Sequence, residues 1–321
     1  MKRYDIFPVD TKISKRVKSL DWLIIAANCD KRAYAISSKL KNDPNIALGN
    51  LCVFDYDKFK PKEDDADNYA QYMIYSTLNP EKVISCIDRD DDIDGLAKLA
   101  ISETQIVGID ITGFAIPDIF RIMFVLSKIQ KITLVYAFYA EPRQYPYKDG
   151  IFDSYELLGG ECTYEALPEY GSSGLQTGEK LNETLVCFLG FDKGKARYMH
   201  EKINPSNTVV INGFPPYLPK YKDISLVNNR DLLNIIGIDS IHYAEAKNPF
   251  ASYNALDSIR KQYDGDLLTV CVLGTKPMAL GACIFSLKNA DNLKVVYPYP
   301  TEYAKNTSDE SDRNWCYIVD L

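Results

Sequence analysis

The stretch that decides the fold is LLTVCVLGTKPMALGACIF, residues 267–285. It begins with an apolar run of strand length, stops at Gly274, Thr275 and Lys276, and continues with small and apolar residues over a helical length. The stretch predicts a strand, a tight turn and a helix. Such a turn points backbone N–H groups, a hydroxyl and an ammonium toward one spot, which suits a phosphate. The alternative is an ordinary packed corner in which Lys276 is solvated.

Apolar runs of strand length alternate with helical patterns along the rest of the chain. In the first half, strands are predicted over residues 22–27, 48–54, 72–76, 105–111 and 132–137. In the second half, strands are predicted over residues 184–189, 208–211, 241–244, 267–273 and 293–297, and a terminal strand over residues 315–319. This alternation predicts parallel sheets with crossover helices, an α/β fold.

The two halves also match residue by residue, in the same order. Asp30-Lys31 corresponds to Asp192-Lys193, Asn79-Pro80 to Asn248-Pro249 before a long helix, and Thr112-Gly113 to Leu273-Gly274. The pattern favours an internal duplication. We therefore expect two tandem Rossmann-like units, each a mainly parallel five-stranded sheet with helices on both faces. Residues 1–150 would form the first unit, residues 151–183 a linker or loop region, and residues 184–321 the second unit.

Composition narrows the classes of function. The chain has 321 residues, 46% of them hydrophobic, and a formal net charge of −7, which argues against bulk nucleic-acid binding. Its eight cysteines are scattered without a Cys-x-x-Cys pair, so we expect reduced core residues in a cytoplasmic protein. There is no apolar run of about 18 residues, which predicts no membrane span.

Familiar cofactor and metal motifs are missing. The chain lacks the Gly-x-Gly-x-x-Gly and P-loop patterns, and its two histidines, His200 and His242, have no ligand array at metal-binding spacing. We expect no cofactor and no metal. Glu245-Ala246-Lys247 could mimic a nuclease Glu-x-Lys with Asp231 or Asp239, but such short patterns are common. The acidic run at residues 88–94 is interpreted as a solvated helix face.

Cations and glycines gather where the predicted strands end, although the protein as a whole is acidic. In an open parallel sheet, ligands lie beyond the carboxyl ends of the strands. The candidate ligand-binding residues are Asp30, Lys31, Arg32, Thr112, Gly113, Asp192, Lys193, Lys195, Gly274, Thr275 and Lys276. The alternatives are solvated lysines at helix starts, and helix capping by Asp30 and Asp192.

The turn at residues 273–278, LGTKPM, resembles the fourth-strand motif of CRISPR-associated Rossmann-fold (CARF) domains, in which Gly-Gly-Thr-Lys precedes an apolar helix. Leu273 replaces the first glycine here, and residues 110–114, DITGF, keep only Thr-Gly. The resemblance implies recognition of a nucleotide or a cyclic or linear oligonucleotide messenger in a cleft between two units. It also implies a role in prokaryotic anti-phage defence, with a protein partner or effector encoded nearby.

Three hypotheses follow. The first is a ligand sensor whose partner supplies the chemistry. The second is an enzyme acting on a nucleotide or nucleotide-sugar phosphate, including a ring nuclease, and the third is a scaffold subunit of a defence complex. Because cations come from both halves, we expect one ligand per chain, with Lys276 gripping phosphate and Phe114 offering a stacking surface.

Overall fold

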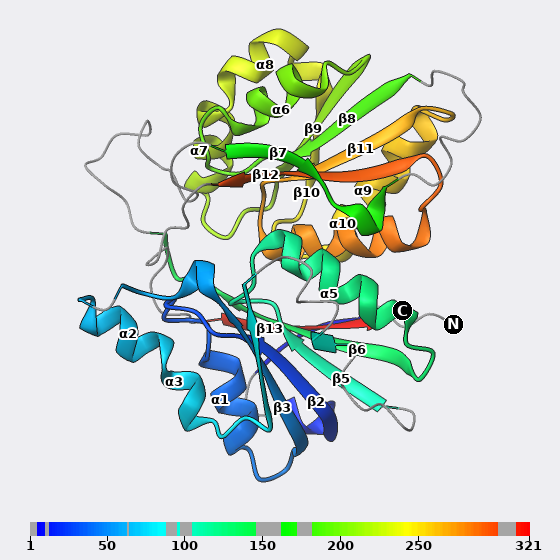
Figure 1. Ribbon diagram of the computed structural model, residues 1–321. Helices are drawn as coiled ribbons and strands as arrows, with labels where there is room; N and C mark the ends of the chain where they lie inside the picture. The colour runs from blue at the N-terminus through cyan, green and yellow to red at the C-terminus, as the bar shows by residue number, and fades with distance from the viewer. Residues whose placement is uncertain are drawn as a thin grey trace. The chain divides into compact units, whose positions relative to one another are not determined.

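The structure is a computed structural model, and it describes residues 5–9, 13–62, 64–87, 95–96, 105–145, 162–171, 182–300 and 313–321. The chain divides into two compact units (Figure 1). Unit 1 is Met1–Pro146 together with Tyr303–Leu321, and unit 2 is Tyr147–Glu302.

Unit 1 is built on a seven-stranded sheet in the order β1-β13-β6-β5-β2-β3-β4. Its strands are β1 (Asp5–Pro8), β2 (Ser19–Ala26), β3 (Ala47–Tyr56), β4 (Lys82–Cys86), β5 (Gln105–Asp110), β6 (Ile132–Glu141) and β13 (Arg313–Asp320). Strands β4, β3, β2, β5 and β6 pair in parallel, and β13 and β1 are antiparallel additions at one side. The central strands are apolar because both faces of a parallel sheet are covered.

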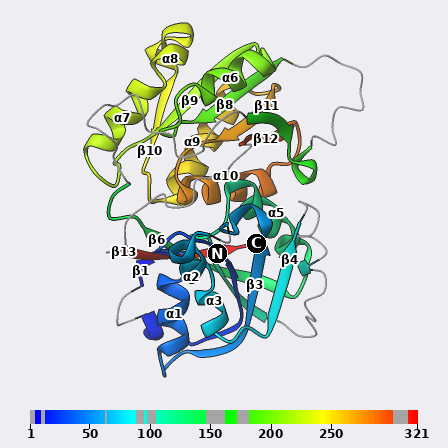
Figure 2. The ribbon, with the colours of Figure 1, turned by 60° about the vertical axis from the view of Figure 1, so that its left-hand side comes forward.

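Helices cover both faces of this sheet, as Figures 1 and 2 show. The helices α1 (Ala35–Asn42), α2 (Ala66–Tyr72) and α3 (Ile74–Thr77) belong to the crossovers between β2, β3 and β4. Helix α5 (Ile116–Lys128) connects β5 to β6 and lies on the opposite face. Short 3-10 turns, Ile13–Lys15 and Asp57–Phe59, complete the described part of the unit.

Unit 2 is built on a six-stranded sheet in the order β10-β9-β8-β11-β12-β7. Its strands are β7 (Cys162–Ala166), β8 (Glu183–Phe188), β9 (Asn207–Gly213), β10 (Ile241–Ala244), β11 (Leu267–Val272) and β12 (Leu293–Pro300). The first five in the sheet order pair in parallel, and β7 is antiparallel to β12.

Helices again cover both faces. Helices α6 (Lys195–Ile203), α7 (Lys220–Asn228) and α8 (Arg230–Ile236) lie on one face of the unit 2 sheet, and α9 (Pro249–Gln262) and α10 (Lys276–Lys288) lie on the other (Figure 1). Short 3-10 turns occupy Pro168–Tyr170 and Ile238–Ser240. The decisive stretch thus forms β11, a turn and α10, as its sequence predicts.

The predicted α/β fold is confirmed. Each unit contains five parallel strands in the same spatial order, with the third, second, first, fourth and fifth strands side by side. Thr112-Gly113 follows β5 and Gly274-Thr275 follows β11, and these two strands hold the same place in their sheets. Equal strand order is what a duplication predicts, although the duplication itself stays a prediction.

The prediction for residues 72–80 is wrong. In the stretch 72–76, expected as a strand, Tyr72 ends α2, Met73 caps it, and the remaining residues lie in α3. Asn79-Pro80 precedes strand β4 instead of a long helix. Asp65 starts α2 because its carboxylate accepts a hydrogen bond from the Asn68 N–H at 3.4 Å. Strand β4 was missed because it is an edge strand, in which only Ile84 and Cys86 are buried.

The predicted boundaries of the units also need correction. The expected linker at residues 151–183 contains β7, which pairs with β12 in unit 2. The terminal strand β13, assigned by sequence to the second unit, pairs over its whole length with β6 in unit 1. Strand β7 follows β6 in sequence but joins the sheet of unit 2, and β13 follows β12 in sequence but joins the sheet of unit 1. The two halves of the chain thus exchange one strand each. Local patterning predicts a strand but not its partner, so sequence could not show this exchange.

Candidate functional site

The predicted site residues come together at the switch point of each sheet, where successive crossovers leave in opposite directions. In unit 1 this point lies between β2 and β5, and in unit 2 it lies between β8 and β11. Asp30, Lys31 and Arg32 thus share one loop cluster with Thr112 and Gly113. A second cluster, in unit 2, contains Asp192, Lys193, Lys195, Gly274, Thr275 and Lys276. Open parallel sheets bind ligands at such points.

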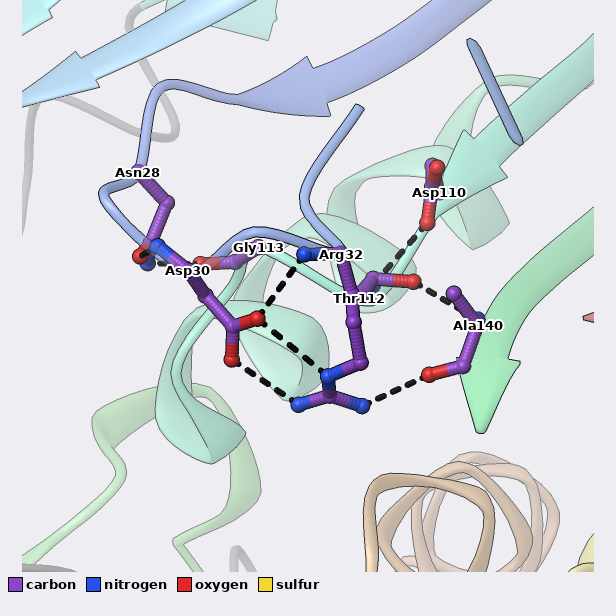
Figure 3. Close-up of polar contacts among 7 residues, drawn as sticks. All are labelled: Asn28, Asp30, Arg32, Asp110, Thr112, Gly113 and Ala140. Atoms are coloured by element: carbon purple, nitrogen blue, oxygen red, sulfur yellow. Dashed lines mark hydrogen bonds and ion pairs between the residues drawn. The ribbon is translucent and has the colours of Figure 1, made fainter. Parts of the chain in front are cut away.

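In unit 1, Arg32 is part of a buried polar network (Figure 3). Its guanidinium pairs with the Asp30 carboxylate at 2.9 Å and donates to the Ala140 carbonyl at 2.6 Å. Only 3% of Arg32 and 5% of Asp30 is exposed. Burial alone would lower the pKa of Arg32, but the neighbouring Asp30 carboxylate, through its charge and its hydrogen bond, contributes to a net rise of the pKa. The expected ligand-binding role of Arg32 is therefore replaced by a structural one.

The other loop of this cluster is held in the same internal way. The Thr112 hydroxyl accepts from the Ala140 N–H at 2.9 Å, and the Asn28 side chain donates to the Gly113 carbonyl at 2.8 Å. A Cβ on Gly113 would lie 2.9 Å from the Ala26 carbonyl oxygen, so the two loops touch through backbone. Thr112 is fully buried. These contacts join the strands of unit 1 and leave Lys31 as the exposed member of the predicted set in this unit.

Phe114 cannot stack on a ligand as expected. Its side chain is fully buried, and its ring packs against Phe54 at 5.9 Å and Tyr56 at 6.2 Å between centroids. The expectation was wrong because a phenylalanine after a strand carries no sequence signal that separates a core ring from an exposed one.

The N-terminus of α5, the counterpart of α10 in unit 1, already holds an anion. The buried Asp118 carboxylate accepts from the Ala115 N–H at 3.2 Å. It also pairs with the Lys58 ammonium at 2.7 Å. A carboxylate at this place satisfies the positive end of the helix dipole. The N-terminus of α5 is therefore already occupied by a carboxylate of the protein.

The N-terminus of α10 in unit 2 carries a different set of groups. Thr275 is the N-cap, with its hydroxyl accepting from the Met278 N–H at 3.3 Å and donating to the Ala246 carbonyl. Lys276 is the first helical residue and is half-buried, and the first turn has no acidic residue. Pro277 has no N–H and the Met278 N–H is already capped, so this helix end presents the positive end of the helix dipole and the Lys276 ammonium where α5 presents a carboxylate.

The N-caps of α5 and α10 show which residues of the two units correspond, and the correspondence differs from the one expected from sequence. Ala115, Ile116 and Pro117 occupy the cap and first two helical positions of α5, and Thr275, Lys276 and Pro277 occupy those of α10. Ile116 is therefore the counterpart of Lys276, and the sequence match of Thr112-Gly113 with Leu273-Gly274 is displaced. Alignment by the Thr-Gly pair failed because the turn before α5 is two residues longer.

The loop between β8 and α6 lies directly beside the α10 turn. A Cβ on Gly190 would come within 1.9 Å of the Leu273 carbonyl oxygen, so only glycine fits there. Asn229 and Ser225 donate to the Gly190 carbonyl at 3.0 and 3.1 Å, and Asn228 donates to the Phe191 carbonyl at 2.6 Å. These three polar residues of α7 and its end fix the loop. Sequence reasoning missed them, because only their Ser-x-x-Asn-Asn spacing marks them.

The charged residues of this loop differ in exposure. Asp192 and Lys195 are buried, whereas Lys193 is exposed. Gly194, the N-cap of α6, has the positive φ of 81° that favours glycine. Cys162 on β7 lies within the field of both buried charges: desolvation raises the pKa of its thiol, Lys195 lowers it and Asp192 raises it. Lys193 and Lys276 are thus the cations of the unit 2 cluster with the greater access to solvent.

The weaker sequence motifs find little support. Glu245 and Lys247 form an ion pair with each other at 3.5 Å. Within the described part of the chain, no cluster of three or more His, Cys, Asp or Glu could hold a metal ion. The acidic run at residues 88–94 lies outside the described residues.

Comparison with known proteins gives no family. The sequence matches no protein-family model, and no curated protein is detectably similar to it. Among solved structures, the chain is similar to a functionally unknown protein of Pseudomonas aeruginosa PAO1, at 9% identity over 90% of this chain and 95% of that one, with a TM-score of 0.24. A protein of P. aeruginosa UCBPP-PA14, provisionally named a universal stress protein, matches at 8% identity over the same shares, with a TM-score of 0.25.

A third similar structure is the cytoplasmic domain of a prokaryotic cation chloride cotransporter, at 10% identity over 89% of this chain and 98% of that one, with a TM-score of 0.26. Among the described helices, none combines the length and apolar character needed to cross a membrane. The function has to be inferred from this chain's own residues.

Proposed function

We propose that the chain binds a phosphate-containing nucleotide, or a cyclic oligonucleotide, at the α10 turn of unit 2. The observation that carries this proposal is the pair of helix ends. The α10 end offers the positive end of the helix dipole and the Lys276 ammonium at a switch point, whereas the equivalent α5 end is occupied by Asp118 and its partner Lys58. Backbone donors at a helix N-terminus, reinforced by an ammonium, stabilise phosphate charge.

The neighbouring loop supports the same ligand class. Gly190 lets this loop pack against the Leu273 carbonyl beside the α10 turn, and the exposed Lys193 follows three residues later. The more exposed charged groups of this cluster, Lys193 and Lys276, are cations that can hold a negative charge, so we propose a sensor ahead of an enzyme. The resemblance to CARF domains motivates the wider proposal of a ligand sensor in prokaryotic anti-phage defence that acts through a protein partner.

The test is calorimetric titration of the full chain with nucleoside triphosphates, cyclic dinucleotides and larger cyclic oligonucleotides. Lys276→Ala should weaken binding about tenfold or more, as for a charge-assisted contact. Its matched control is Lys288→Ala, in the last turn of the same helix and therefore at the opposite end. Both variants should melt close to the wild type.

Two outcomes would overturn the proposal: no binding by any compound in the panel, or equal affinities for the two variants. The titration also measures stoichiometry. The expectation of one ligand per chain stays a prediction, and two equivalent sites per chain would contradict it.

A further inference from the structure

Two large aromatic side chains of unit 2 are left on its surface. Phe214 and Tyr243 are each 50% exposed, and their rings meet edge to face with centroids 6.0 Å apart. Most other large apolar side chains of this unit that the structure describes are buried. Exposed aromatic pairs of this kind offer a stacking surface. We call Phe214 and Tyr243 the aromatic platform.

The platform lies at the same edge of the sheet as the α10 turn. Phe214 directly follows β9, and Tyr243 is the penultimate residue of β10. Strands β9 and β10 run parallel to β8 and β11, so their carboxyl ends all lie at one edge. The Phe214 N–H donates to the Ala244 carbonyl at 2.7 Å, which holds the two strand ends together.

A shared acceptor ties the platform to the α10 turn. The Ala246 carbonyl accepts from the Thr275 hydroxyl and, at 3.2 Å, from the Tyr217 hydroxyl. The Ala246 N–H in turn donates to the Pro215 carbonyl at 3.1 Å. The helix cap and the loop that carries Phe214 are therefore fixed to one peptide group.

Packing confirms that the two features are close. A Cβ on Gly274 would lie 3.1 Å from the Met278 sulfur, and a Cβ on Gly213 would lie 3.7 Å from the same sulfur. The turn that precedes Lys276 and the residue that precedes Phe214 thus flank a single side chain. The backbone that carries Phe214 therefore lies close to the backbone of the α10 turn.

Charge at the platform indicates the kind of ligand. The Lys222 ammonium lies 5.7 Å from the centre of the Phe214 ring. Its ion pair with Asp223, at 3.5 Å, is exposed and therefore weak. A cation beside an aromatic surface favours a flat ligand that carries negative charge over a neutral apolar one.

We infer that the aromatic platform stacks on the base of a nucleotide whose phosphates lie at the α10 turn. This inference rests on the proposed function and adds the base-binding part of the site. Every base has a π face, so stacking on Phe214 and Tyr243 strengthens binding without hydrogen-bond readout of the base.

The experiment compares ligands with and without a base. The full chain is titrated with ATP, a cyclic adenine dinucleotide and inorganic tripolyphosphate, as wild type, Phe214→Ala, Tyr243→Ala and Lys276→Ala. The matched control is Ile238→Ala, because Ile238 is 77% exposed and precedes β10 at the opposite edge of the sheet. The platform variants remove exposed side chains, so their melting temperatures should stay near the wild type.

We expect Phe214→Ala to weaken binding of the adenine nucleotides about tenfold and to leave tripolyphosphate binding unchanged. Lys276→Ala should weaken both, and Ile238→Ala neither. If tripolyphosphate binding depends on Lys276 but adenine-nucleotide binding ignores both platform variants, the platform is overturned and the phosphate site stands. If no probe binds, the proposed function and the platform fall together.

Discussion

Arg32 and Lys276 are both cations at the carboxyl end of a strand, yet their surroundings give them different roles. The Arg32 guanidinium is enclosed by Asp30 and the Ala140 carbonyl, so its charge is used inside the protein. Lys276 is the half-buried first residue of α10, and we propose that its charge serves a ligand. A planar guanidinium suits the enclosed place because it donates in several fixed directions.

Replacement of Arg32 should destabilise unit 1. Arg32→Ala leaves the buried Asp30 carboxylate without its ion pair, and we expect a loss of about 3–5 kcal/mol in the free energy of unfolding. Lys31→Ala is the matched control: Lys31 is the exposed neighbour, and its replacement should change stability by less than about 0.5 kcal/mol. Chemical denaturation of both variants measures the difference. Equal stabilities would show that the buried pair contributes nothing net.

At the scale of elements, α10 is positioned by two close approaches. The turn that precedes α10 meets the β8–α6 loop, where Gly190 packs against Leu273. Its middle meets α9 at Gly281, where a Cβ would lie 2.0 Å from the Pro249 carbonyl oxygen and 2.8 Å from the Ser252 Cβ. Because α10 is held at both places, its N-terminal N–H groups have a fixed direction relative to the sheet.

Gly281→Ala tests this packing, because a close contact predicts that the variant is less stable than the wild type, whereas open space predicts that it is more stable. In an exposed helix, the change from glycine to alanine stabilises by roughly 0.5–1 kcal/mol. At Gly281 the new methyl group would collide with backbone, so we expect a loss of about 1–3 kcal/mol or more. Thermal unfolding of the variant measures it. A stabilised variant would contradict the close contact of α9 and α10.

At the scale of the whole molecule, the two halves of the sequence exchange one strand each, β7 and β13. Strand β13 lies between β1 and β6, so the sheet of unit 1 needs the last residues of the chain. Strand β7 gives unit 2 its antiparallel edge from residues before β8. A fragment of residues 184–321 would lack β7 and carry an unpaired β13, so it is not a fair sample of unit 2.

A chain that ends at residue 302 should lose unit 1 selectively. Removal of β13 exposes the edge of β6 and leaves β1 without its partner, so the unfolding transition of unit 1 should weaken or disappear. Unit 2, Tyr147–Glu302, keeps all its described strands and should unfold near its original temperature. Calorimetry measures the unfolding transitions of the two units. The transition that Gly281→Ala moves to lower temperature is that of unit 2, because Gly281 lies in α10.

The matched control for this truncation is a chain that ends at Asp320, which removes only Leu321 and leaves β13 whole. It should unfold like the full chain. An unchanged unit 1 transition in the chain that ends at residue 302 would show that β13 contributes no stability to that sheet.

The sequence by itself determined the α/β class, most strands and the α10 turn, because continuous apolar runs and punctuating Gly, Pro and Asn residues act locally. It could not determine the helical state of residues 72–76, where the Asp65 cap and burial of Tyr72 outweigh local strand preference.

Only the tertiary structure decided which sheet β7 and β13 join, and which cations of the switch points are enclosed. Asp30 lies close to Arg32 in sequence, but Ala140, which completes the enclosure, is more than a hundred residues away. Likewise, Asp118 occupies the N-terminus of α5 because Lys58, sixty residues away in sequence, and the Ala115 N–H meet it in the folded chain. Which strands pair and which charged side chains are buried depend on segments that are distant in sequence, so the local spacing of residues does not predict them.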